Sequence, residues 1–127
     1  MASALHLDTN VLIFGLDPHH PARRQFRSWR VAGEPVAVSA MAWAEFRCGP
    51  VTPDSVRAWE QAIGEAVIPL DRTIAELGAS LFNQTGRRSR SLSDCLIAAT
   101  AIRFGARLAT LNQSDFEPLL AHGLVLA

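Results

Sequence analysis

Apolar positions along this chain fall into two kinds of run, short ones typical of β-strands and longer ones with the spacing of α-helices. The short runs cover residues 4–8, 35–39, 67–70, 107–111 and 123–127. The longer, helical patterns cover residues 10–16, 21–32, 40–48, 52–66, 71–86 and 92–104. Strands that alternate with helices indicate an α/β fold. We therefore predict a single domain over residues 1–127, with a mainly parallel four- to five-stranded sheet flanked by helices on both faces.

Residues with special backbone or capping preferences mark the ends of these elements. Pro21 suits a first helical turn, Ser39 suits a helix N-cap, and Gly105 suits a helix end. Proline in the 67–70 run suggests a strand at a sheet edge, and the polar stretch 86–91 is predicted to be a loop. In such sheets the working site lies beyond the carboxyl ends of the strands. Residues that follow a strand are therefore candidates for chemistry.

Composition narrows the function classes. With 49% apolar and 19% charged residues, the 127-residue chain has the composition of one globular domain. Its formal net charge is zero, so any attraction to nucleic acid must come from local patches. All 12 basic residues are arginines. The absence of lysine excludes a phosphate-binding P-loop and Schiff-base chemistry.

The two cysteines and the apolar runs indicate in which cellular compartment the protein is expected. Cys48 and Cys95 lack metal-ligand spacing, and both fall in apolar helical stretches, so we expect buried free thiols. The N-terminus lacks the pattern of a signal peptide, and no apolar run approaches the ~18 residues that a membrane span needs. We expect a soluble cytoplasmic protein without a membrane partner.

Four acidic residues stand out by their placement. Asp8 ends the first strand, Glu45 lies inside an apolar helix, Asp94 opens the apolar helix at 92–104, and Asp115 follows the fourth strand. The ends of the first and fourth strands and the start of that helix are expected to meet at one edge of the sheet. Glu45 is costly to bury without compensation, and a metal ion would supply it.

Each of these acids also has a structural interpretation when it is taken alone. Asp8 could start the next turn through its side chain, and Asp94 could belong to a capping box that begins at Ser91. Glu45 could reach solvent from the rim of its helix. Asp115 could cap a short C-terminal turn. The joint placement of the four acids is what favours a functional site.

A cluster of carboxylates favours a divalent cation. At ~4 Å each charged pair repels by about 1 kcal/mol in water, and by about 4 kcal/mol at an effective dielectric of 20. Oxygen-only ligands favour Mg²⁺ or Mn²⁺ over zinc. One ion could activate a water while a second held the leaving group of a phosphodiester, and the sequence leaves one or two ions open. None of the four histidines pairs with a plausible nucleophile, so a histidine general base is not expected.

Arginines flank the predicted acidic centre. Arg23, Arg27 and Arg30 have i, i+4, i+7 spacing on one helix, next to Arg24. A second group lies just upstream of Asp94 and consists of Arg87, Arg88 and Arg90. Both groups are candidate phosphate contacts; the alternative is a solvated helix face and a polar loop. Trp29, Trp43 and Trp59 are interpreted as helix-packing residues, and the alternative is a base-stacking or partner-binding role.

Four sequence blocks together resemble PIN domains, and most of all VapC-type toxins. The blocks are LDTNVL at 7–12, SAMAWAEF at 39–46, SDCLIAATA at 93–101 and LATLNQSDF at 108–116. The resemblance covers nearly the whole chain. It implies a parallel sheet flanked by helices, acidic residues that bind Mg²⁺ or Mn²⁺, and cleavage of RNA. It also implies a cognate VapB-type antitoxin and a homodimer.

The resemblance assigns roles by position. Asp8, Glu45 and Asp94 match the family's three strongest acidic sites. Asn112 falls where some relatives have an acid, and Asp115 offers a carboxylate three residues later. We favour Asp115 as the fourth acid, with Asn112 and Thr110 as polar supports.

Asn10, which follows Asp8 and Thr9, matches a residue that supports the family's acids. The leading hypothesis is a metal-dependent endoribonuclease. The alternative is a PIN-like module that acts by binding a partner with little cleavage, and a small-molecule phosphohydrolase is disfavoured by the missing lysine.

Overall fold

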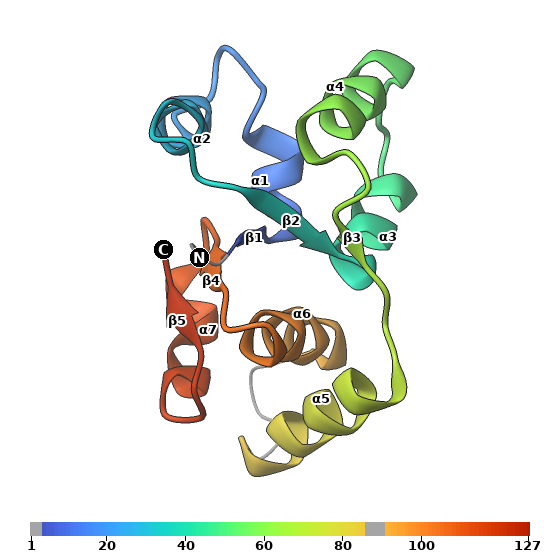
Figure 1. Cartoon of the computed structure of the whole chain (residues 1–127), viewed down its shortest axis with the longest axis vertical. Helices are drawn as coiled ribbons and strands as arrows, with labels where there is room; N and C mark the ends of the chain where they lie inside the picture. The colour runs from blue at the N-terminus through green and yellow to red at the C-terminus, as the bar shows by residue number, and fades with distance from the viewer. Residues whose placement is uncertain (1–3, 86–90) are drawn as a thin grey trace.

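The computed structural model describes residues 4–85 and 91–127, and its centre is a parallel β-sheet (Figure 1). Within these residues the strands are β1 (Leu5–Leu7), β2 (Val36–Ser39), β3 (Val67–Ile68), β4 (Arg107–Ala109) and β5 (Val125–Leu126). The helices are α1 (Thr9–Phe14), α2 (Ala22–Val31), α3 (Ala40–Cys48), α4 (Pro53–Ile63), α5 (Arg72–Gln84), α6 (Leu92–Arg103) and α7 (Gln113–Leu120). The α/β class and the parallel sheet are confirmed.

The strand order is β3-β2-β1-β4-β5, and every pair of neighbours is parallel. β1 lies in the middle, where Leu5 pairs with Val36 of β2 on one side and with Arg107 of β4 on the other. β3 is an edge strand, as the proline that follows it predicted. The carboxyl ends of β1 and β4 therefore lie side by side, and the residues after them meet.

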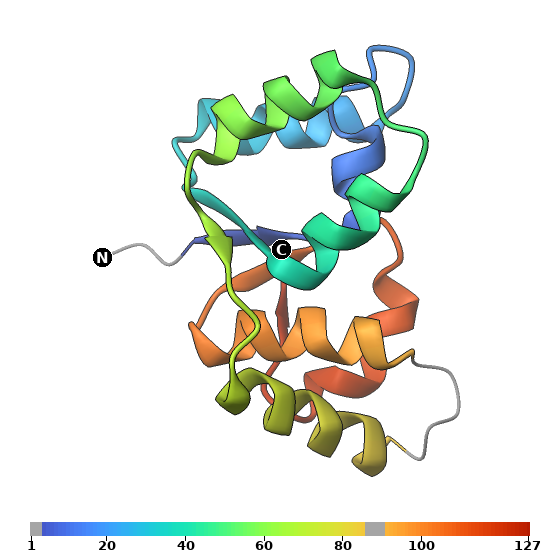
Figure 2. The same ribbon diagram turned by 90° about the vertical axis from the view of Figure 1, so that its right-hand side faces the viewer.

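Helices cover both faces of the sheet. Figure 2 shows α1, α2, α3 and α4 on one side of the strands and α5, α6 and α7 on the other. α6 lies between the sheet and α5, and its residues from Cys95 to Ala101 are all buried. Gly78 of α5 allows this close approach, since a Cβ built there would lie 2.5 Å from Leu96 Cδ2. Packing on both sides fixes the position of α6.

An aromatic contact holds the helices of the other face. The rings of Phe26 in α2 and Trp59 in α4 meet edge to face, with centroids 4.8 Å apart. Trp59 is fully buried, and its Nε1 donates a 2.8 Å hydrogen bond to the backbone oxygen of Leu12 in α1. The predicted packing role is confirmed for Trp59. The contact ties α1, which carries residues of the site, to α2 and α4.

The structure differs from the sequence-based prediction in the bounds and the number of its helices. α4 ends at Ile63 rather than near residue 66, because Gly64 adopts a positive φ of 58°. α7 was not predicted as a helix.

The two cysteines differ in burial. Cys95 is buried as expected, but the prediction for Cys48 is wrong because it is exposed at the end of α3. The predicted loop at 86–91 lies outside the described residues except for Ser91, which caps α6. None of the described helices is long and apolar enough to cross a membrane.

Candidate active site

Asp8 follows β1 directly and is held in place by both neighbouring segments. Its backbone N–H donates to Ala109 of β4 at 2.9 Å, which continues the ladder one residue beyond the strand. Its Oδ1 accepts a 2.8 Å hydrogen bond from the N–H of Thr9, and its Oδ2 accepts one of 2.7 Å from the hydroxyl of Thr110. Asp8 therefore caps α1, which agrees with the interpretation that its side chain starts the next turn. It also presents a fixed carboxylate at the sheet's carboxyl edge.

The surroundings of Asp8 disfavour the ionised form of its carboxyl group. Its side chain is only 5% exposed, and burial raises its pKa from 3.8 to about 6. The hydrogen bonds from Thr110 and Thr9 act in the opposite direction. The negative charges of Asp94 and Glu45 raise the pKa further. Asp94 and Glu45 thus lie close enough to act on Asp8 through space, and a positive charge among the three would relieve the repulsion.

Glu45 reaches this site from α3. Ser39 caps that helix by accepting from the N–H of Ala42 at 3.0 Å, as the sequence predicted. Glu45 Oε1 accepts a 2.8 Å hydrogen bond from the hydroxyl of Thr9, and the side chain is half-buried. Thr9 therefore donates to two carboxylates, through its backbone N–H to Asp8 and through its hydroxyl to Glu45. Sequence analysis missed this residue, although its position between Asp8 and Asn10 was a signal.

Asp94 lies in the first turn of α6. Ser91 Oγ accepts a 3.1 Å hydrogen bond from the Asp94 N–H and so caps the helix. The positive end of the helix dipole favours a carboxylate at this position. In Figure 2 the N-terminal end of α6 lies on the side of the sheet where β1 ends. The fold thus brings Asp94 to the side of Asp8 from the helix below the sheet.

The segment after β4 supports the site through polar contacts. The hydroxyl of Thr110 accepts from the N–H of Asn112 at 3.1 Å while it donates to Asp8. Asn10 Oδ1 accepts a 3.2 Å hydrogen bond from the N–H of Leu111. Asn10 and Thr110 therefore join the start of α1 to the end of β4. Asn112 contributes its backbone and stands at the N-cap position of α7, where its side chain makes no capping bond.

Asp115 lies in the first turn of α7 and is exposed. Its N–H donates to the backbone oxygen of Asn112 at 3.0 Å, which belongs to the opening of the helix. Asp115 is not among the charges that raise the pKa of Asp8. Its role as the fourth acid stays a prediction.

The oxygen ligands of the site suit some cations better than others. Within residues 4–85 and 91–127, no three His, Cys, Asp or Glu side chains converge closely enough to hold a metal ion. Mg²⁺ needs fewer protein ligands, because it is usually held by one or two carboxylates and keeps several waters. A buried carboxyl with a raised pKa and two acidic neighbours offers such oxygen ligands. The residues therefore fit a hydrated divalent cation rather than a closed protein cage.

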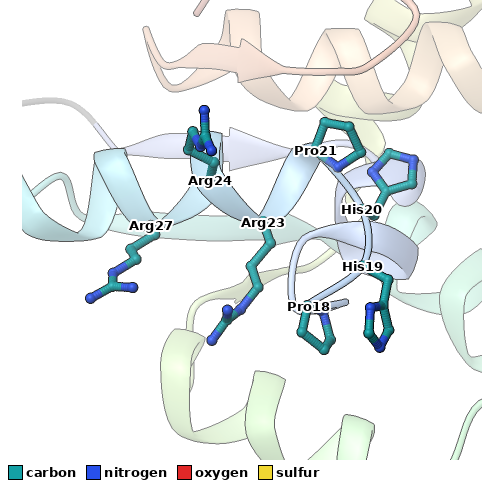
Figure 3. Close-up of a pocket in the computed structure, with 7 residues that line it drawn as sticks. All are labelled: Pro18, His19, His20, Pro21, Arg23, Arg24 and Arg27. Carbon is teal, nitrogen blue, oxygen red and sulfur yellow. The ribbon is translucent and has the colours of Figure 1, made fainter.

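The arginines that were predicted to contact phosphate do not all lie together. Arg23, Arg24 and Arg27 line a pocket of about 510 Å³ at the start of α2 (Figure 3). Arg30 turns to α4, where its Nη1 donates to the backbone oxygen of Ala62 at 3.3 Å. The other predicted group, Arg87, Arg88 and Arg90, lies outside the described residues.

Comparisons with known proteins agree with this fold. Residues 5–117 match the family model described as PIN domain. Among solved structures, FitAcB from Neisseria gonorrhoeae is 25% identical, with 97% of this chain and 96% of that chain covered and a TM-score of 0.72. A toxin–antitoxin complex from Klebsiella pneumoniae is 28% identical, with 91% of each chain covered and a TM-score of 0.71.

A third similar structure is VapBC-5 from Mycobacterium tuberculosis, a member of the VapBC family of toxin–antitoxin systems. It is 26% identical, with 98% of this chain and 99% of that chain covered and a TM-score of 0.63. No curated protein matches the sequence.

Proposed function

This chain belongs to the PIN domain family, and on that premise we propose that it is a divalent-metal-dependent endoribonuclease, the toxin of a type II toxin–antitoxin pair. The observation that carries the proposal is the state of Asp8. Burial and the charges of Asp94 and Glu45 raise the pKa of Asp8 to about 6, so its ionised form is disfavoured and a nearby cation would stabilise that form. Carboxylates arranged around a cation suit phosphodiester hydrolysis.

Asp8 and Asp94 are proposed to hold Mg²⁺ or Mn²⁺, with Glu45 and Asp115 as further acids toward solvent. One or two bound ions would neutralise phosphate charge and make a water more acidic. Thr9 and Thr110 keep the Asp8 carboxylate in one orientation through their hydrogen bonds. Each oxygen of Asp8 therefore accepts one hydrogen bond from a neighbouring threonine.

Glu45 is proposed to act on the proton of the attacking water. Its Oε1 accepts a hydrogen bond from the Thr9 hydroxyl, and the side chain is half-buried. The second oxygen, Oε2, can then accept a hydrogen bond from the water that attacks phosphorus. Attack by water would leave a 5′-phosphate and a 3′-hydroxyl, and the 2′-hydroxyl of RNA would not be the nucleophile.

Partners are proposed from the similar structures. The Klebsiella structure is a toxin–antitoxin complex, and VapBC-5 is a member of a family of toxin–antitoxin systems. They match 91% and 98% of this chain at 28% and 26% identity. We propose that this chain likewise binds a VapB-type antitoxin and forms a homodimer. Co-expression with a neighbouring antitoxin gene, followed by light scattering of the purified product, would test both points.

The central experiment measures RNA cleavage with Mg²⁺. The purified protein should cleave RNA, and Asp94→Asn should abolish cleavage while the thermal unfolding curve keeps its cooperativity. Asp54→Asn is a matched control, because Asp54 also lies in the first turn of a helix but is exposed and pairs with Arg57. Cleavage that survived in Asp94→Asn would overturn the proposal.

One observation favours a second candidate, a PIN-like module that acts by binding its partner with little cleavage. No three potential ligands converge in the described part of the chain. Thermal unfolding with Mn²⁺ separates the candidates. An enzyme site should melt at a higher temperature with the ion, whereas a module without a working site should not respond.

A further inference from the structure

A basic pocket lies at the start of α2, away from the carboxylates. Its volume is about 510 Å³, and it is lined by Pro18, His19, His20, Pro21, Arg23, Arg24 and Arg27. In Figure 3 the side chains of Arg23 and Arg27 point to the same side of α2 as His19, whereas Arg24 points to the opposite side. The i, i+4 spacing of Arg23 and Arg27 places both guanidinium groups along one rim of the pocket.

The positive charge of this rim is not neutralised within the described part of the chain. Ion pairs there join Arg57 to Asp54, Arg72 to Glu76 and Arg107 to Glu34. Arg23 and Arg27 take part in none of them. In a chain whose formal net charge is zero, two adjacent arginines without an acidic partner form a local site for an anion.

The turn before α2 is fixed by its own hydrogen bonds. Asp17 Oδ1 accepts from the N–H of His19 at 2.9 Å, and His20 Nδ1 accepts from the N–H of Ala22 at 3.0 Å. The His20 ring also stacks on Phe14, with centroids 4.4 Å apart. The turn holds the pocket open in one shape, so an anion would bind without first ordering the backbone.

A second pocket shares residues with the basic pocket and extends to a residue that is bonded to Asp8. His20 and Pro21 line both pockets, and the second, of about 500 Å³, extends to Trp29 and Thr110. Thr110 donates its hydroxyl hydrogen bond to Asp8. The two pockets together therefore run from Thr110, past the half-buried Trp29 and over the turn at His20, to Arg23 and Arg27. The indole ring of Trp29 offers a stacking surface, and the guanidinium groups of Arg23 and Arg27 offer phosphate contacts. A single nucleic-acid strand needs both.

We propose that the pocket at His19, Arg23 and Arg27 binds a backbone phosphate of the RNA strand at a distance from the bond that is cleaved at Asp8. The proposal rests on the ribonuclease function above and adds the path of the substrate. It excludes Arg30, which had the same helical spacing, because that side chain is engaged by Ala62. The strand would cross the N-terminal end of α2 between the two pockets.

The test measures binding of a single-stranded RNA of about ten nucleotides, within the usual site size of single-strand binders. It is made in the Asp94→Asn background so that the RNA stays intact. The variant Arg23→Gln with Arg27→Gln should bind roughly tenfold more weakly, and the salt dependence of log K should fall by about 0.7 for each phosphate that the protein no longer binds. The control is Arg57→Gln with Arg72→Gln, which removes the same charge from α4 and α5 and should bind as the parent does.

Cleavage provides a second measurement in the protein with Asp94 intact. On the proposed path a dinucleotide would not reach the basic pocket, so the double variant should cleave it at the parental rate and should lose rate only on longer RNA. Equal binding by the parent and the double variant, or an equal loss in the control, would overturn the proposal. So would a double variant that failed to bind only its antitoxin, because the pocket would then be a protein contact. A parent that neither bound nor cleaved RNA would instead overturn the proposed function.

Discussion

Thr110 and Asp8 are 102 positions apart in the sequence, and a 2.7 Å hydrogen bond joins the hydroxyl of the first to the carboxylate of the second. The bond joins the residues that follow β1 and β4, the central strand of the sheet and one of its two neighbours. It favours the ionised form of Asp8 against the burial that raises its pKa. Thr110 is thus a positioning residue for the carboxylate.

Replacing Thr110 by Val should therefore impair the site without reshaping it. Loss of a hydrogen bond to a charged group raises the pKa of Asp8 further, since about 1.4 kcal/mol corresponds to one pKa unit. We expect kcat/KM for RNA to fall by about tenfold to a hundredfold, as for residues that orient metal ligands. The acidic limb of the pH profile should move to higher pH.

Thr100→Val is the matched control for that variant. Thr100 is also buried, but its hydroxyl donates to the backbone oxygen of Leu96 within α6. Its replacement should leave the pH profile in place. Identical profiles for the two variants would show that Thr110 has no special effect on Asp8.

Asp8→Asn should stabilise the metal-free protein at neutral pH. The raised pKa of Asp8 favours folding below its unfolded value of 3.8, and this contribution is lost as pH rises to about 6. The folded protein then carries a buried charge that costs about 3 kcal/mol, and Asn removes most of it. Urea unfolding with a chelator present should show a gain at pH 7.5 and little change at pH 3.5. A variant less stable than the parent at pH 7.5 would contradict this.

His6 should give the opposite pH dependence. Burial lowers its pKa from 6.5 to about 4. The contribution of His6 to stability is complete above pH 6.5 and is lost as pH falls towards 4, because the unfolded chain then binds a proton that the folded chain does not. In the Asp8→Asn variant, stability should therefore fall between pH 6.5 and 4. A flat profile in that variant would contradict the assignment to His6.

Mn²⁺ should raise the unfolding temperature of the parent protein. An ion that binds the folded chain alone stabilises it by about 2.7 kcal/mol at a hundred times its Kd. Asp8→Asn should lose most of this shift, whereas the surface variant Asp54→Asn should keep it. An equal shift in both variants would place the ion elsewhere. Differential scanning fluorimetry with matched chelated samples measures it.

Gly78→Ala should destabilise the fold without touching the site. The added methyl would lie 2.5 Å from Leu96 Cδ2, so α5 and α6 must separate or Leu96 must change its rotamer. We expect a loss of roughly 1–3 kcal/mol in the free energy of unfolding. Gly49→Ala is the control, because its new Cβ would meet the Phe46 backbone oxygen at an ordinary 3.6 Å. Equal unfolding midpoints for the two variants would contradict the close packing of α5 and α6.

Local signals in the sequence were enough for most of the sheet and for the position of Asp8. The apolar run of β1 ends at an acid, and caps such as Ser39 and Asp71 accept the hydrogen bonds that their residue types suggest. The paired roles of Thr9 could not be predicted, because the contact of its hydroxyl with Glu45 spans 36 positions and depends on how α1 packs against α3.

The missed helix α7 and the wrong prediction for Cys48 also have physical causes. α7 contains Pro118 and several polar residues, so its eight residues show little helical periodicity. Cys48 lies two residues after buried Phe46 in α3, which places it on the opposite side of the helix. Apolar composition alone could not distinguish these two faces.

The hydrogen bond between Thr110 and Asp8 also determines when the site can exist during synthesis. A ribosome makes Asp8 102 residues before Thr110. Until β4 has emerged and paired with β1, the carboxylate lacks one of its two donors and the strand that encloses it. The carboxylate site can therefore form only after the chain as far as β4 has been synthesised.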